Sequence, residues 1–164
     1  MGKKRKKPTP RIEDGRKIVA RNRRARHFHH IEDTVEAGLA LVGTEVKSLR
    51  QGAVTLKDGY AAHRTEELFL FGVHITPYTH GTHENHDPER PRKLLLHRRQ
   101  IRRLIGYVAE RGYTLLPLEI YFNERGKAKV LLGLARGKKH FDRREDVKKR
   151  EAEREIERAL RRRR

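Results

Sequence analysis

The 164-residue chain contains no cysteine, which excludes disulfide bonds and thiolate metal sites. It has no tryptophan, and several of its five phenylalanines and five tyrosines fall in predicted core segments. Few rings therefore remain for the stacking surface on which sequence-tolerant single-strand binders depend. No run approaches the ~20 apolar residues of a membrane-spanning helix. The charged start MGKKRKKPTP leads into no apolar core of the kind that signal peptides have. The sequence thus favours a cytoplasmic protein.

What the chain does have is positive charge, most of it at the two ends. The formal net charge is +19. Residues 1–26 hold 12 Lys and Arg against two acidic residues, and residues 137–164 hold 13 against seven, whereas the 110 residues between them carry only +3. Runs of like charge that cannot bury apolar surface stay solvated and bind polyanions, because neutralising phosphates releases condensed counterions. The favoured partner is nucleic acid.

Two other interpretations of the basic ends are weaker. An anionic membrane would attract them, but neither end has the apolar helical face that inserts into an interface, so no membrane partner is expected. The run KKRKK at Lys3–Lys7 is compatible with a nuclear address, although any basic RNA-binding arm has the same composition.

The nearly neutral middle has the patterns of a folded, mainly β domain. Apolar residues of His27–Gly43 are spaced for strand pairing with a break near Glu32–Asp33, which predicts one long bent strand or two short ones. A polar RTEE between extended runs predicts a hairpin whose return strand, Leu68–Ile75, is buried on both faces. A second hairpin is predicted around Asn123–Gly126, followed by the alternation of a strand with one wet face.

Two helices are predicted between these strands. Gly43–Gly52 is short and bracketed by glycines. The second helix carries apolar residues at i, i+3, i+4 and i+7 from Ile101, has arginines at its other positions, and stops at Gly112. Several short antiparallel strands with a few helices predict a small closed or partly closed barrel, because closure removes exposed sheet edges.

A histidine-rich segment invites a metal interpretation. His80, His83 and His86 recur at every third residue, with Glu84 and Asp87 interleaved, and imidazole plus carboxylate is a plausible zinc set. The spacing is loose and the neighbours are Gly, Thr, Asn and Pro, which favours a polar connecting loop. We therefore predict no metal site.

No catalytic motif is present, so no enzymatic activity is expected. The chain has no Cys nucleophile, no glycine-rich phosphate loop ahead of a helix, and no HExxH. Two alternatives stay open. One is a ribosomal or generic single-strand RNA-binding protein, and the other is a metal-dependent nuclease using carboxylates such as Glu45 and Asp58.

Four stretches of the chain have the order and composition of one known family: RARHFHHIEDTVEAGLALVGTEVKSLRQG, FLFGVHITPY, DPERPRKLLLH and GLARGKKHFDRREDVKKRE. They resemble the SsrA-binding protein family, also called small protein B, the bacterial partners of transfer-messenger RNA. The resemblance runs from about Arg24 to Arg150. It implies an OB-fold-like antiparallel β-barrel with about three helices, no cofactor, and a role in rescuing ribosomes stalled on messages without a stop codon.

The resemblance also implies where RNA binds. The barrel would hold the tRNA-like domain of transfer-messenger RNA, one protein copy per RNA, and enter the vacant A site of the ribosome with it. His27 would lie toward the decoding region. Packing of Leu95 in the core is an equally open alternative to an RNA contact. At position 97 the family pattern has Asn, whereas this chain has His97. The implied RNA-facing residues are Glu36, Leu95, His97, Lys138 and Lys139.

The basic C-terminal tail has a helical charge pattern but little to pack it. Asp142 and Glu145 resemble a capping box, and charged pairs three and four residues apart follow. Because no continuous apolar stripe could dock this helix on the barrel, we expect the tail to be disordered when free. The resemblance implies that the tail becomes helical in the empty mRNA channel of a stalled ribosome. The residues it implies at the decoding region and channel are Asp142, Arg143, Arg144, Lys148, Lys149 and Arg150. The predicted divisions are a basic arm over 1–23, a barrel over 24–136 and a tail over 137–164.

Overall fold

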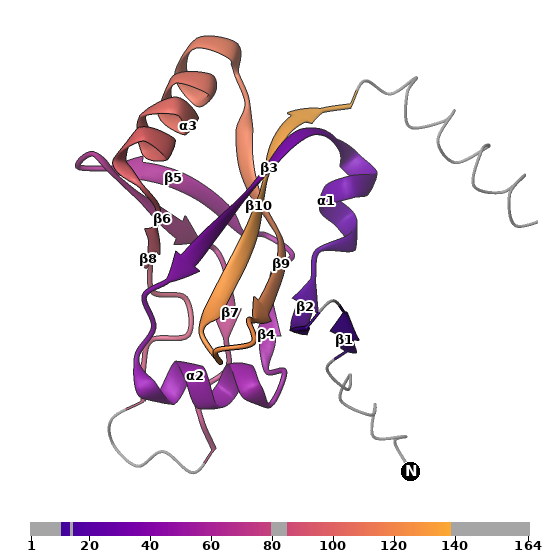
Figure 1. Cartoon of the computed structure of the whole chain (residues 1–164), viewed down its shortest axis with the longest axis vertical. Helices are drawn as coiled ribbons and strands as arrows, with labels where there is room; N and C mark the ends of the chain where they lie inside the picture. The colour runs from indigo at the N-terminus through magenta and orange to yellow at the C-terminus, as the bar shows by residue number, and fades with distance from the viewer. Residues whose placement is uncertain (1–10, 14, 80–84, 139–164) are drawn as a thin grey trace, which may run out of the picture.

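The computed structural model describes residues 11–13, 15–79 and 85–138 (Figure 1). Within these residues the chain forms ten strands and three helices. In chain order they are β1 (Arg11–Glu13), β2 (Arg16–Arg21), α1 (Arg23–Phe28), β3 (His29–Leu39), α2 (Gly43–Arg50), β4 (Val54–Thr55), β5 (Tyr60–Arg64), β6 (Glu67–Phe71), β7 (His74–Ile75), β8 (Arg92–Leu95), α3 (Arg98–Arg111), β9 (Thr114–Phe122) and β10 (Ala128–Gly137).

Eight strands form one antiparallel sheet in the order β1-β2-β9-β10-β3-β8-β6-β5. An additional pairing of Ala61 with Leu115 joins β5 back to β9, so the six strands from β9 to β5 form a closed circuit of neighbours. The short strands β4 and β7 pair separately. The prediction of a mainly β, antiparallel fold with three helices is confirmed.

One apolar core fills the inside of this circuit. Leu70 of β6, Leu94 of β8 and Ile120 of β9 are buried in it. Leu49 of α2 and Leu104 of α3 belong to the same cluster, and the two helices lie at opposite ends of the sheet (Figure 1). Both predicted helices are therefore confirmed, and each buries its apolar side on the core.

The N-terminal boundary of the folded body differs from the prediction. β2 pairs with β9, and its central residues Ile18 and Val19 are buried. The sequence RKIVAR was assigned to the basic arm because of its charges, but the two apolar residues between them suffice to anchor a strand. The folded part thus reaches into the predicted arm over 1–23, and residues 1–10 lie outside the described residues.

The strand predicted from His27 begins at His29, because α1 precedes it. The Asn22 side chain accepts a hydrogen bond from the Ala25 amide at 3.0 Å and donates one to the Leu56 carbonyl at 3.0 Å. This N-cap starts a short helix, which contains His27. From His29 on, the prediction of one long bent strand is confirmed, since the register with β10 shifts opposite Glu32 while the strand continues.

The first predicted hairpin is present, but its return strand is shorter and less buried than expected. Thr65 and Glu66 form the turn between β5 and β6 with positive φ values of 51° and 61°, as in the tight turns that match strand twist. β6 ends at Phe71 because Gly72 adopts a φ of 63°. Only the Leu68 side of β6 is fully buried, and the other side is half-buried. Burial on both faces is therefore wrong.

The second predicted hairpin is confirmed. Its turn closes with a hydrogen bond from the Lys127 amide to Asn123 Oδ1 at 2.8 Å, and Gly126 adopts a φ of 69°. Val130 and Leu132 are buried while Lys129 and Leu131 are partly exposed. The predicted alternation of β10 thus places its lysine on the outer side of the sheet.

Candidate nucleic-acid interface

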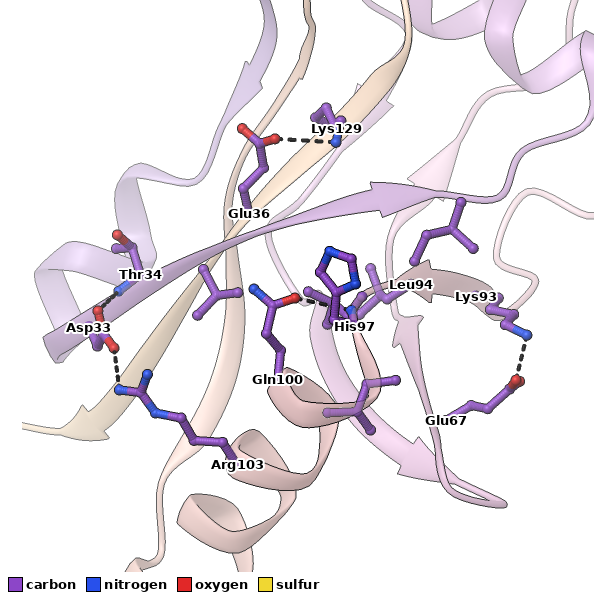
Figure 2. A pocket seen from close by; sticks show the side chains of 14 residues that line it. Asp33, Thr34, Glu36, Glu67, Lys93, Leu94, His97, Gln100, Arg103 and Lys129 are labelled. Atoms are coloured by element: carbon purple, nitrogen blue, oxygen red, sulfur yellow. Dashed lines mark hydrogen bonds and ion pairs between the residues drawn. The ribbon is translucent and has the colours of Figure 1, made fainter.

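An open groove of about 940 Å³ lies between β3, β8 and the first turns of α3 (Figure 2). Its lining residues come mainly from these three elements, with Glu67 of β6 and Lys129 of β10 beside them. Three of the five residues predicted to face RNA meet in it, namely Glu36, Leu95 and His97. They are far apart in the sequence and come together because β3 and β8 pair through Gly38 and Leu95.

Leu95 is exposed, so the core-packing alternative for this residue is wrong. Its side chain is 53% accessible, whereas that of Leu94 is 1% accessible. The strand partner of Leu95 is Gly38, and a Cβ there would lie 3.1 Å from the Leu95 Cβ. Leu95 also lines a neighbouring hollow of about 400 Å³. Leu95 is thus an exposed apolar side chain that lines two neighbouring hollows.

Glu36 projects from the outer side of β3 and is held by two partners. The buried Tyr121 hydroxyl donates a hydrogen bond to Glu36 Oε2, and Lys129 Nζ lies 3.2 Å from Oε1 (Figure 2). The hydrogen bond from Tyr121, followed by the hydrogen bond and charge of Lys129, keeps the pKa of Glu36 below its ordinary value, although partial burial acts in the opposite direction. The side chain is still 43% exposed. Glu36 therefore offers an ionised, oriented carboxylate to a ligand.

Tyr121 supports this carboxylate from beneath. Its burial, and then its hydrogen bond to Glu36, raise its pKa, so it acts as a hydroxyl donor at neutral pH. The Arg16 guanidinium lies 5.2 Å from the centre of the Tyr121 ring. Sequence reasoning missed Tyr121 because its position in an apolar strand gives no sign of a polar partner across the sheet.

His97 is the N-cap residue of α3. Its backbone amide donates to Gln100 Oε1 at 3.0 Å, while its ring makes no capping hydrogen bond. The Asn of the family pattern is a residue type that commonly caps helices through its side chain. Here the ring points into the groove instead (Figure 2).

The groove also contains charged residues that the sequence-based interpretation did not single out. Each cation has an acidic partner: Lys93 Nζ lies 2.5 Å from Glu67 Oε1, and Arg103 Nη2 lies 3.1 Å from Asp33 Oδ2. Together with Lys129 they make an outer surface of alternating charge. The alternation of β10 already placed Lys129 on a wet face, but only the strand pairing shows which face that is.

Lys138 lies at a different place from the groove. Its amide donates to the Phe28 carbonyl at 3.0 Å, next to the partly buried His27 at the end of α1. The register pairs Gly137 with His29, seven strand positions from Glu36, which corresponds to roughly 20 Å. The predicted RNA-facing set is thus divided between the groove and the far end of β10. Lys139, Asp142, Arg143, Arg144, Lys148, Lys149 and Arg150 lie outside the described residues.

Glu45, a carboxylate considered for a nuclease site, is fully buried and occupied by arginines. Arg92 Nε and Arg90 Nε each lie 2.9 Å from Oε1, and Arg90 Nη2 and the Val42 amide lie 2.5 and 2.9 Å from Oε2. Burial alone would raise the pKa of Glu45, but the hydrogen bonds from Arg90 and Val42 and the charge of Arg92 hold it below the ordinary value. No oxygen of Glu45 is left for a metal ion.

The described part of the histidine-rich segment has a structural role. His86 Nε2 donates to the Ile75 carbonyl at 2.9 Å, and its Nδ1 lies 3.2 Å from Thr44 Oγ1. The ring thus ties this segment to α2 and β7. His80 and His83 lie outside the described residues. Across residues 11–13, 15–79 and 85–138 no group of three His, Asp or Glu side chains could hold a metal ion, and no helix there is long and apolar enough to cross a membrane.

Comparison with known proteins identifies the family of this chain from its sequence and from its structure. The SmpB family model, described as SmpB protein, matches residues 19–162. The chain is 58% identical over 145 residues to the SsrA-binding protein of Geobacillus thermodenitrificans (88% of this chain, 93% of the relative) and 59% identical over 150 residues to that of Thermobifida fusca (92% and 93%).

A solved structure described as "tmRNA-SmpB: a journey to the center of the bacterial ribosome" contains a chain with 57% sequence identity and a TM-score of 0.64. The similarity covers 75% of the present chain and 85% of that one. The residues that the family model matches, 19–162, include those that line the groove and the N-cap of α3. With a family model over most of its length and relatives of this identity, the chain belongs to the SmpB family.

Proposed function

We propose that this protein binds the tRNA-like domain of transfer-messenger RNA and takes part with it in the rescue of stalled ribosomes. The observation that carries the proposal is the convergence of Glu36, Leu95 and His97 on one open groove. Support comes from the relatives, which are named SsrA-binding proteins, and from the structural neighbour, whose description names tmRNA and the bacterial ribosome.

The groove has the chemistry for recognising folded RNA. Structured RNA is read largely through shape, 2′-hydroxyls, phosphates and unstacked loop bases. The Glu36 carboxylate can accept hydrogen bonds from base amino groups or a 2′-hydroxyl, and Lys129 beside it can contact phosphate. Leu95 offers an apolar contact to a base that has left its stack. These are binding roles, and none requires a catalytic group.

The other end of β10 is assigned to the ribosome. The amide of Lys138, the last described residue, hydrogen-bonds to the carbonyl of Phe28, the neighbour of His27 in the chain. We assign His27 to the decoding region and the following tail residues to the decoding region and mRNA channel. In the same way, we interpret the closed circuit of six strands as a small OB-fold-like β-barrel, with one protein bound per RNA.

The proposal is tested by electrophoretic retention of transfer-messenger RNA by the purified protein in the presence of excess ordinary tRNA. We expect retention to survive the competitor. Equal competition by tRNA would show a general RNA-binding protein and overturn the proposal.

A further inference from the structure

Three aromatic rings gather on the outer face of β5 and β6, away from the main core. Tyr60 and Phe71 are strand partners, and their rings stack with centroids 5.5 Å apart and planes 19° apart. Phe69 lies next to them, 6.5 Å from Phe71. Tyr60 is 46% exposed, and both phenylalanines are half-buried. We call these three residues the ring cluster.

The register shows why the ring cluster faces outward. Leu68 and Leu70 of β6 point to the core and are buried, so the residues between them point to the other side of the sheet. Phe69 is the strand partner of Lys93, and Lys93 lines the groove. Strand partners have their Cβ atoms about 5 Å apart. The ring cluster therefore borders the groove at Lys93; β8 lies beside β6 in the sheet (Figure 1).

Exposed rings on a strand surface beside basic residues are the typical platform for unpaired bases. Every base has a π-face, and stacking on an aromatic side chain stabilises it whatever the sequence. Arg64, on the outer side of β5, is exposed, and Lys93 flanks Phe69, so phosphates on either side of a stacked base would meet cations. Lys93 is paired with Glu67 at 2.5 Å, so Arg64 is the cation here with the greater capacity to bind phosphate.

We propose that Tyr60, Phe69 and Phe71 form a stacking site for unpaired RNA bases, separate from the contacts made in the groove. The proposal rests on the proposed function only for the presence of RNA in the neighbouring groove. It predicts that an unpaired segment leaving the groove across β8 lies on β6 and β5, with Tyr60 as the most exposed contact.

The absence of tryptophan from the chain allows a direct test in the full-length protein. Tyr60→Trp introduces a single indole, whose fluorescence is quenched when a base stacks on it. The matched control is Tyr78→Trp, which places the indole beside Lys47 of α2, outside the ring cluster. The probe is an unstructured oligoadenylate of about eight nucleotides, within the range of site sizes of OB-type domains.

We expect saturable quenching of Tyr60→Trp and none of Tyr78→Trp. In a second measurement, Tyr60→Leu should weaken binding of transfer-messenger RNA roughly 5-fold or more, whereas Tyr60→Phe, which keeps the ring, should not. The side chain is exposed, so both variants should unfold at the temperature of the wild type.

Several results would overturn the stacking site. These are absence of quenching, equal quenching of both tryptophan variants, or normal RNA affinity of Tyr60→Leu. If Tyr60→Leu changed the sedimentation of the protein in the absence of RNA, the ring cluster would contact a second copy of the protein instead. If Tyr60→Leu binds normally while Glu36→Gln binds weakly, the proposed function stands and the stacking site fails. If oligoadenylate quenches the fluorescence of Tyr60→Trp but tRNA competes fully with transfer-messenger RNA, the stacking site stands and the proposed function fails.

Discussion

Two carboxylates of this protein, Glu45 and Glu36, are each held by neighbouring side chains but differ in exposure. Glu45 is fully buried between Arg90 and Arg92, and Arg92 is itself fully buried. Glu36 is held by Tyr121 and Lys129, yet its side chain is 43% exposed. In both cases the partners keep the pKa below its ordinary value. What differs is whether the carboxylate has accessible oxygen left for a ligand.

The buried cluster serves the fold around the groove. Arg92 also donates to the carbonyls of Val73 and Pro88, at 2.6 and 2.9 Å. It therefore fixes β8 between α2 and the β7 segment, and β8 presents Leu95 three residues later. The buried carboxylate holds the strand from the core side, and the exposed one faces the groove.

The largest expected effect is on stability, from Glu45→Ala. Removing one partner of a buried pair leaves Arg92 charged and unpaired, which typically costs about 3–5 kcal/mol. Chemical denaturation measures the loss. Because most of the cost is the unpaired charge, Glu45→Ala combined with Arg92→Met should lose less than the sum of the two single changes. Additive losses would mean that the pair is not coupled.

Next in size is the effect of Glu36→Gln on RNA affinity. If the ionised carboxylate accepts hydrogen bonds from RNA, binding of transfer-messenger RNA should weaken by about 1–3 kcal/mol, as for hydrogen bonds to charged groups. The loss of stability at neutral pH should be smaller than the loss of affinity, because the side chain is 43% exposed. Equal losses of stability and affinity would place Glu36 with Glu45 as a fold-forming residue.

A smaller effect is expected from Tyr121→Phe, which removes only the hydroxyl that orients Glu36. One hydrogen bond lost at the edge of a site corresponds to about 0.5–1.5 kcal/mol of RNA affinity. Titration with transfer-messenger RNA should show this loss in the wild-type background and none on top of Glu36→Gln. A full additional loss in the double variant would mean that Tyr121 acts independently of Glu36.

The stability of the wild type should depend more strongly on acid pH than that of Glu36→Gln. A carboxyl whose pKa is lowered by folding stabilises the protein above its ordinary pKa of 4.5, and this contribution disappears as the pH falls below that value. Between neutral pH and acid, the unfolding midpoint of the wild type should fall further than that of Glu36→Gln. Parallel curves would contradict the lowered pKa of Glu36.

The smallest effect is expected at Glu66, the matched control. It forms an exposed pair with Arg98 at 3.4 Å, and surface pairs of this kind contribute little. Glu66→Gln makes the same chemical change as Glu36→Gln, and its effect should stay within about 0.5 kcal/mol for both stability and RNA affinity. A larger loss of affinity would extend the interface to the β5–β6 turn.

The sequence by itself determined the period of α3 and of β10 and the C-terminal end of α3. The i, i+3, i+4, i+7 pattern from Ile101 and the stop at Gly112 are local properties, and so is the alternation after Gly126. The motifs were also sufficient to indicate the family. Where the sequence failed, a charge or spacing pattern hid a local signal, as in RKIVAR, which reads as a basic arm but forms β2.

In β6 and β8, where adjacent residues are both apolar, only the tertiary structure decided which side of the strand meets the core. A two-residue period shows that Leu94 and Leu95 point in opposite directions, but pairing with Gly38, 57 positions earlier, sets which one is exposed. The same holds for Glu36 and Glu45, for Tyr121, and for Tyr60, Phe69 and Phe71, which were assigned in part to the core. Direction relative to the core depends on contacts between residues far apart in the chain, and no local pattern contains that information.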